Sequence, residues 1–216
     1  MSSSIGRKIL KKVKYILMIL VALITAFTLG SFTPNSMVIS NIEDIEHRKS
    51  VVSAQKLGLL EPRFEYTDDK TFVEAVYKCI DYLNYTTMPE KRIPSGLIVA
   101  MAGIESGWGT SRFSNEGNAL FGVRTWSLDT VPHMKPKAIP DANFGVKKYK
   151  TKCQSVKDVV RILNSHPAYK EFRKERDRQY KGNFRNWDIL VPLIAPWSTT
   201  EEYGDIILST IKKRGF

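Results

Sequence analysis

The sequence predicts a mainly α-helical (α+β) fold: a helical domain with a small β-prone lobe, preceded by one N-terminal transmembrane helix. Three observations lead to this fold class. Residues 15–32 form an apolar run without a charged side chain. After residue 68, apolar residues recur at the spacing of amphipathic helices. Residues 124–150 differ, because three prolines exclude a long helix there.

The N-terminal segment has the features of a signal anchor. The uncharged run of 18 residues at 15–32 is just long enough to cross the hydrocarbon core of a bilayer as a helix. Five basic residues precede it, and the next charged residue after it is Glu43. The positive-inside rule then makes residues 1–14 a cytoplasmic tail and places the rest of the chain outside. We expect a single-pass protein that contacts the lipid bilayer, with signal-peptide cleavage near residues 28–31 as the alternative.

The exported part divides into a stem and a domain. Residues 33–68 are expected to form the stem, in which the segment from Ile42 to Leu60 favours an amphipathic helix. Residues 69–216 are expected to form the catalytic domain.

Five helices are predicted in this domain. The first carries an apolar stripe from Phe72 to Leu83 and can be capped by Thr67 or Asp68. The second covers residues 95–106 and is apolar on every face, so it should be buried centrally. The later helices are expected to begin at Ser155, where Asp158 completes a capping box, at about Tyr169, and at Ser198 or Thr199, the last one ending at Gly215.

Residues 124–150 predict the small lobe. Within it, the segment 143–149 alternates as an exposed strand does. A cleft between this lobe and the helices would suit a polymeric ligand.

Composition narrows the possible partners. The formal net charge of the 216 residues is +11, and about +6 remains without the five N-terminal cations, which favours anionic partners. The chain has neither zinc-ligand spacing nor a basic stripe interleaved with aromatics, so no nucleic-acid partner is expected. The three histidines are scattered, and neither a metal nor a cofactor is expected. Cys79 and Cys153 can pair in an oxidising compartment or be buried separately.

Glu105 is the principal candidate for catalysis. It follows the apolar run of the second predicted helix, and Gly107 and Gly109 end that helix just after it. Burial and the negative end of the helix dipole both favour the neutral carboxyl form, and Trp108 adds an apolar wall. The pKa of Glu105 should therefore be raised, as a general acid requires.

The residues around Glu105 resemble a known family. The segment 105–113, ESGWGTSRF, followed by NALFG at 118–122, is similar to the peptidoglycan endo-β-N-acetylglucosaminidases (glucosaminidases) of the lysozyme-like superfamily. A second block, residues 144–169, ends in a matching turn that contains Asn164, His166, Pro167 and Tyr169, and the Bax-like branch is the nearest in pattern. The resemblance covers about residues 70–212. It implies a lysozyme-like fold and hydrolysis of the β-1,4 bond after N-acetylglucosamine in peptidoglycan or a related glycan.

The resemblance also implies roles for single residues. Glu105 would be the general acid, and Tyr149 would orient the N-acetyl group or a water. A second carboxylate is expected from Asp141 or Asp129 in the lobe, whereas Glu116 is expected to support its loop. Alternatively, the substrate's own acetamido group replaces the base. The sequence leaves these alternatives open.

Substrate contacts are expected from Trp108, Asn118, Phe121 and Trp197. Core packing is the favoured role for Trp126, Trp187, Trp197 and Phe121, and among these Trp197 is the best candidate for a stacking contact. Two other functions remain open: a lytic transglycosylase on the same fold, and an inactive membrane-tethered glycan-binding protein.

Overall fold

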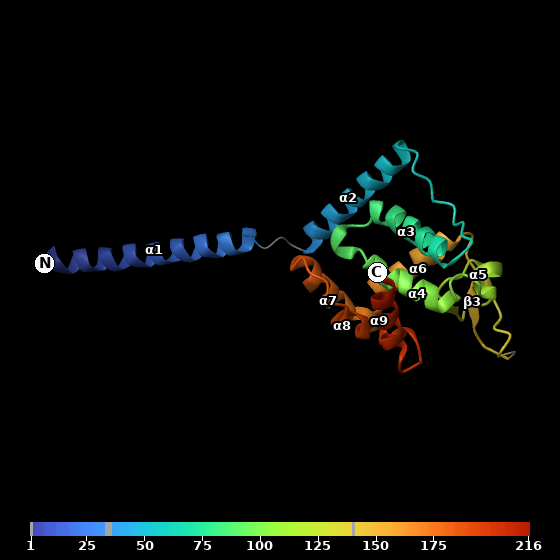
Figure 1. Cartoon of the computed structure of the whole chain (residues 1–216). Helices are drawn as coiled ribbons and strands as arrows, with labels where there is room; N and C mark the ends of the chain where they lie inside the picture. Colours follow the sequence, from blue (N-terminus) through green and yellow to red (C-terminus); the bar gives the residue numbers. More distant parts are fainter. Residues whose placement is uncertain (1, 33–35, 140) are drawn as a thin grey trace. The chain divides into compact units, whose positions relative to one another are not determined.

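The computed structural model describes residues 2–32, 36–139 and 141–216 (Figure 1). The chain divides into two compact units, Met1–Arg48 and Lys49–Phe216. The first contains helix α1 (Ser2–Phe32) and the start of helix α2 (Ser36–Lys56). The second begins within the predicted stem and contains the end of α2 and all later elements.

Helix α1 covers the predicted membrane anchor. None of the helices, over the residues described, is both long and apolar enough to cross a membrane. The structure therefore does not support the predicted transmembrane helix over residues 15–32 or the lipid bilayer as a partner.

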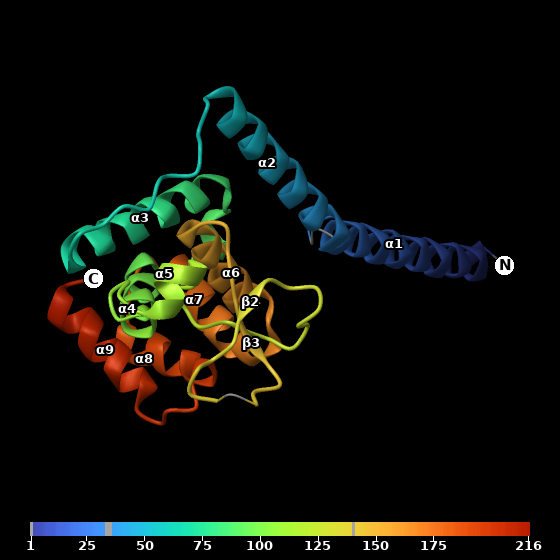
Figure 2. The ribbon, with the colours of Figure 1, turned by 90° about the vertical axis from the view of Figure 1, so that its right-hand side faces the viewer.

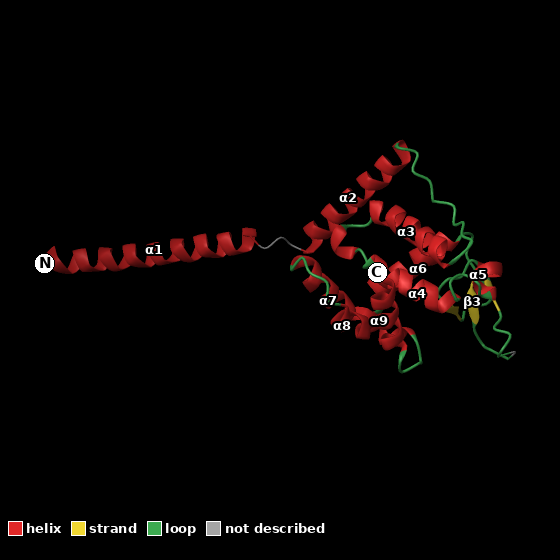
Figure 3. Ribbon diagram, in the orientation of Figure 1, coloured by secondary structure: helices red, strands yellow, loops and turns green. Residues whose placement is uncertain are grey.

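The second unit is mainly helical with a small sheet, as predicted (Figure 3). Its α-helices are α3 (Asp69–Thr86), α4 (Ser95–Ser106), α5 (Arg112–Gly117), α6 (Lys152–Ser165), α7 (Lys170–Lys181), α8 (Trp187–Leu190) and α9 (Tyr203–Arg214). Its 3-10 helices are η1 (Pro89–Lys91), η2 (Pro167–Tyr169) and η3 (Val191–Trp197), and its strands are β1 (Arg124–Thr125), β2 (His133–Met134) and β3 (Gly145–Lys147).

Helix α4 forms the centre of the core. Every residue from Gly96 to Gly103 is buried, which confirms the prediction from its uniformly apolar sequence. Helices α3 and α9 both pack against it, and Figures 1 and 2 show α4 between them. The burial of α4 fixes where its last turn, and therefore Glu105, meets the surface.

The predicted start of the first domain helix is confirmed. Asp68 caps α3: its carboxylate accepts a hydrogen bond from the Thr71 backbone N–H at 2.8 Å, and the Thr71 hydroxyl accepts from the Asp68 N–H at 3.0 Å.

Two later predicted starts are wrong. Helix α6 begins at Lys152, because the hydroxyl of Thr151 caps it by accepting from the Gln154 N–H at 3.2 Å. Ser155 instead lies inside the helix, where its buried hydroxyl accepts from the Leu120 N–H at 3.3 Å. Helix α9 begins at Tyr203 rather than near residue 198, because a turn closed from Tyr203 N–H to Thr200 O at 3.2 Å precedes it.

The predicted lobe contains a three-stranded antiparallel sheet in the order β1-β3-β2. Arg124 faces Val146 in one pair, and His133 faces Lys147 in the other. Gly145 allows the close approach of β2, since a Cβ there would lie 2.4 Å from the His133 ring.

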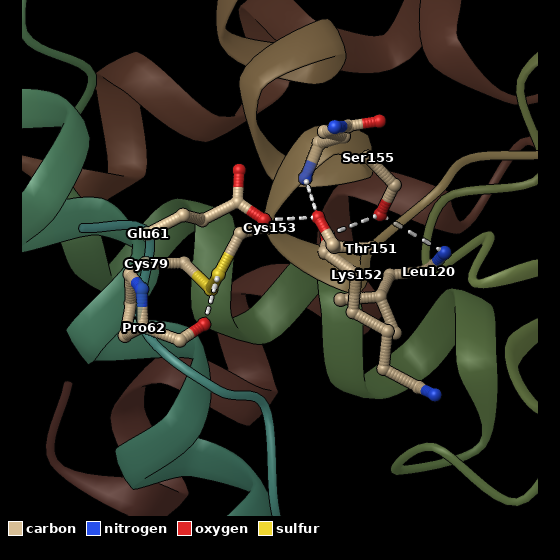
Figure 4. The surroundings of a disulfide bond; sticks show 9 residues. Glu61, Pro62, Cys79, Leu120, Thr151, Lys152, Cys153 and Ser155 are labelled. Atoms are coloured by element: carbon tan, nitrogen blue, oxygen red, sulfur yellow. Dashed lines mark hydrogen bonds between the residues drawn. A yellow bond between two sulfur atoms is a disulfide. The ribbon is translucent and has the colours of Figure 1, made fainter.

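A disulfide joins Cys79 of α3 to Cys153 of α6 across 5.2 Å between the Cα atoms (Figure 4). The sequence left this pairing open. Beside it runs the extended segment 59–68, which we call the strap. Glu61 of the strap accepts a hydrogen bond from the Thr151 hydroxyl, and the Tyr66 hydroxyl donates to Gly109 O at 2.7 Å. These contacts connect the strap to the start of α6 and to the turn that follows Glu105.

Candidate active site

Glu105 lies in the last turn of α4, where a tight turn ends the helix. Gly107, Trp108 and Gly109 all have left-handed φ values of +58°, +54° and +87°. Buried Ser106 holds this turn, because its hydroxyl donates to Ala102 O at 2.6 Å and accepts from the Gly109 N–H at 2.8 Å. The two glycines after Glu105 are therefore favoured by the backbone geometry of the turn.

Trp108 packs back onto the helix that it follows. A Cβ on Gly103 would lie 2.6 Å from its ring, so only glycine fits at that helix position. Phe72 lies edge-on at 6.2 Å between ring centroids, and the Arg214 guanidinium lies 3.9 Å from the centre of the indole. These contacts place Trp108 as a half-buried wall beneath the turn.

The Glu105 carboxylate is half-buried, and burial raises its pKa. Tyr203 of α9 and Trp197 of η3 act in the opposite direction, because their O–H and N–H groups favour the charged form. Both lie near enough to affect the carboxylate, yet neither contact reaches hydrogen-bond geometry. The Tyr203 side chain is only 4% exposed, and its hydroxyl has no hydrogen-bond partner among the described residues.

The NALFG segment approaches the same carboxylate. Gly122 has a left-handed φ of +58°, and a Cβ there would lie 3.8 Å from Glu105 Oε2. Its neighbour Phe121 is buried in the core, and the Phe121 ring lies edge-on to Trp197 at 6.5 Å. Phe121 thus packs in the core against the Trp197 ring.

Two aromatic side chains, Tyr169 and His166, continue from Trp197. Tyr169 lies 6.3 Å from Trp197, and His166 lies 5.8 Å from Tyr169, both between ring centroids.

Burial and the neighbouring Glu105 raise the pKa of Tyr203, so its hydroxyl remains a donor. The sequence indicated Tyr203 only as a packing residue of the last helix, since an aromatic in an apolar stripe does not reveal a carboxylate nearby.

Tyr149 belongs to a separate polar cluster. Its hydroxyl donates to Asp158 Oδ2 at 2.8 Å, and Lys147 Nζ donates to the same oxygen at 3.0 Å. Burial raises the pKa of Asp158, but hydrogen bonds from Arg161, Lys147 and Tyr149 outweigh it and lower the pKa overall. Asn118 fixes the backbone of this segment by donating to Tyr149 O and Lys150 O, each at 3.1 Å.

The remaining predicted acids are on the surface. Asp129 and Asp141 are exposed residues of the lobe, and Glu116 is exposed and paired with Arg112 at 3.4 Å. Trp126 does not pack in the core: it is 65% exposed and lies 6.3 Å from the Phe144 ring. Within the described residues, no group of three or more His, Cys, Asp or Glu could hold a metal ion.

Comparisons with known proteins agree with the predicted family and fold. A family model for mannosyl-glycoprotein endo-beta-N-acetylglucosaminidase (glucosaminidase) matches residues 84–215. Protein bax of Escherichia coli (strain K12) is 36% identical over 93 residues, which are 42% of this chain and only 31% of that relative. The catalytic domain of the autolysin Auto from Listeria monocytogenes aligns with a TM-score of 0.51 at 16% identity, covering 85% of this chain and 97% of that one. This structural likeness, which concerns the fold alone, confirms the predicted lysozyme-like domain.

Proposed function

The chain belongs to the glucosaminidase family, and from this premise we propose that it is a glycoside hydrolase. Its proposed reaction is cleavage of the β-1,4 bond after N-acetylglucosamine in peptidoglycan or a related glycan, with Glu105 as general acid. The observation that carries the proposal is the half-buried carboxylate of Glu105, whose pKa is raised by burial.

The residues around Glu105 suit both the protonated and the ionised form of a general acid. Before reaction, burial favours the protonated carboxyl, which can protonate the leaving oxygen. After proton transfer, the Tyr203 O–H and the Trp197 N–H are donors that stabilise the new carboxylate. Tyr203 is thus a positioning residue of the proposed mechanism.

For the second group we keep two alternatives. Asp129 or Asp141 can act as the base, because an inverting mechanism needs a carboxylate roughly 6.5–9.5 Å from the acid and the lobe carries both. Otherwise the acetamido group of the substrate supplies the nucleophile. Loss of activity in only one of Asp129→Asn and Asp141→Asn identifies the base, whereas full activity in both variants favours the acetamido group.

Two other proposed features concern the substrate. The hydroxyl of Tyr149 donates to Asp158, which leaves its oxygen able to accept from an N-acetyl N–H or a water. Trp126 offers an exposed ring beside Phe144, which a sugar face can stack on.

We place the activity outside the cytoplasm. The Cys79–Cys153 disulfide supports this, because such bonds persist in oxidising compartments and are rare in the cytosol. A substrate in the cell wall requires the same location.

The decisive experiment compares Glu105→Gln with wild type on purified peptidoglycan. The amide keeps the shape of the side chain but cannot supply the proton, so activity should fall at least about 100-fold. Glu74→Gln, which changes an exposed acid of α3, is the matched control and should behave as wild type.

Mass spectrometry of the products tests the reaction type. Fragments with N-acetylglucosamine at the reducing end support a glucosaminidase, and anhydro-sugar ends indicate a lytic transglycosylase instead. Equal activity of Glu105→Gln and wild type contradicts the role of Glu105. If neither protein cleaves while both bind peptidoglycan, the chain is a glycan-binding protein.

A further inference from the structure

A second candidate site lies at the opposite end of α4 from Glu105. A cavity of about 360 Å³ opens where this helix begins, beside η1, α7 and α8. Ser95 and Glu105 are separated by roughly 15 Å along the helix axis, at 1.5 Å per residue. The cavity is therefore distinct from the proposed catalytic site.

The walls of this cavity are cationic and aromatic. Arg92, Arg176 and Arg185 line it together with Tyr180 and Trp187, and we call it the arginine cavity. Among the described residues that line it there is no Asp or Glu. Its volume is within the range of small-molecule sites, close to the lower limit of about 300 Å³.

One of the three arginines pairs with an acid, and the other two form hydrogen bonds, among the described residues, to neutral groups only. Arg92 donates from Nε to Thr87 O at 3.0 Å and from Nη2 to Asn84 O at 2.9 Å. Arg176 is 4% exposed and pairs with Asp177, at 2.8 Å from Nη2 to Oδ1. Its charge is therefore neutralised, whereas the charge of Arg92 is not.

Arg185 is the least satisfied of the three. It donates from Nη1 to Gln179 Oε1 at 3.1 Å, and its guanidinium lies 5.5 Å from the Trp187 ring centroid. Over the described chain, neither Arg185 nor Arg92 forms an ion pair with an acid, and both line the cavity. Burial lowers the pKa of Arg185, which marks the cost of desolvating its charge. A bound anion would offset that cost.

The start of α4 adds backbone donors. Its N-cap is Pro94, which makes no side-chain capping bond. The first N–H groups of a helix have no acceptor within the helix, and Ser95 and Gly96, the first two residues of α4, line the cavity. Phe216 packs against Gly96 but does not line the cavity. A helix start favours anions through these N–H groups and the helix dipole.

We propose that the arginine cavity binds an organic phosphate, with Arg92 and Arg185 as its ligands and Trp187 and Tyr180 against the group that carries the phosphate. Guanidinium groups match the oxygens of a phosphate with paired N–H donors. The volume allows a phosphate together with one sugar or glycerol unit. Such a group occurs in soluble sugar phosphates, in phosphate-containing wall polymers and in lipid headgroups.

The test is calorimetric titration of the full chain with inorganic phosphate and with glucose 1-phosphate. We expect saturable binding, tighter for glucose 1-phosphate because the aromatic walls contact its sugar. Arg92→Ala and Arg185→Ala should each weaken binding at least about tenfold, which corresponds to about 1.4 kcal/mol. Arg63→Ala removes a cation from the exposed strap and is the matched control, with unchanged affinity expected. Arg92 and Arg185 are both exposed, and thermal unfolding of each variant checks that it is folded.

Vesicle binding separates the sources of the phosphate. Phosphatidylglycerol vesicles are compared with phosphatidylcholine vesicles for wild type and the two cavity variants. If wild type prefers phosphatidylglycerol vesicles and both variants lose this preference, the ligand is a lipid headgroup. If the protein binds glucose 1-phosphate but not the vesicles, the phosphate comes from a soluble compound or a wall polymer. Absence of saturable phosphate binding in every arm, or an equal loss in Arg63→Ala, overturns the proposal. None of these measurements depends on Glu105 or on glycan cleavage.

Discussion

The Cys79–Cys153 disulfide should contribute a large part of the stability of the second unit. The two cysteines are 74 residues apart. In the chain-entropy relation, a loop of that length lowers the entropy of the unfolded chain enough to stabilise the fold by about 4 kcal/mol. Domains are stable by only about 5–15 kcal/mol, so the loss is severe. For a unit of this size it corresponds to a fall in Tm of roughly 8–16 °C.

The perturbation is the double variant Cys79→Ala/Cys153→Ala, measured by urea unfolding. Tryptophan fluorescence is a suitable probe, because all four tryptophans lie in the second unit. Either single alanine variant also removes the bond, so each should lose nearly as much stability as the double variant. Wild type unfolded with a reducing agent should match the variants. If reduction leaves the unfolding midpoint of wild type unchanged, the disulfide does not stabilise the fold and our reasoning is refuted.

Three further predictions concern the site. Tyr203→Phe removes a donor that lowers the pKa of Glu105, so the alkaline limb of the activity–pH profile should move to higher pH, where Glu105 otherwise loses its proton. Trp126→Ala should weaken glycan binding by about 1–3 kcal/mol in a binding assay while leaving Tm unchanged, since the ring is exposed. Gly103→Ala should destabilise the fold by about 1–3 kcal/mol in urea unfolding, because its Cβ would meet an indole at 2.6 Å. Gly204→Ala, with its nearest atom at 3.8 Å, is the tolerated control.

The features that the sequence predicted correctly are local ones. The burial of α4 follows from an apolar run on every face, and its end follows from Gly107, whose φ is +58°. The Asp68 cap is likewise set within three residues of the chain. The wrong start of α6 has a physical cause: Thr151 and Ser155 are both possible caps, and Asp158 instead accepts hydrogen bonds from Lys147 and Tyr149 of another segment.

The surroundings of Glu105 could be predicted only in part. The NALFG segment was singled out by the family resemblance, and a Cβ on its Gly122 would lie 3.8 Å from Glu105 Oε2. Tyr203 was not expected there, because 98 residues separate it from Glu105 and only tertiary packing brings α9 to α4. Similarly, the arginine cavity collects side chains from η1, α7 and the segment before α8, which share no motif.

The acid strength of Glu105 therefore depends on how α9 packs. Burial by α4 and its neighbours raises the pKa, whereas donors from Tyr203 and Trp197 lower it. The first effect keeps the proton on the acid, and the second makes its release possible, so a pKa near the working pH needs both. Since both donors come from segments that follow residue 190, a substitution there that removes a donor without admitting water to the carboxylate should raise the pKa of Glu105. The alkaline limb of activity would then move before the fluorescence of the folded state changes. If activity and folding are instead lost together in every such variant, the donors do not tune the acid.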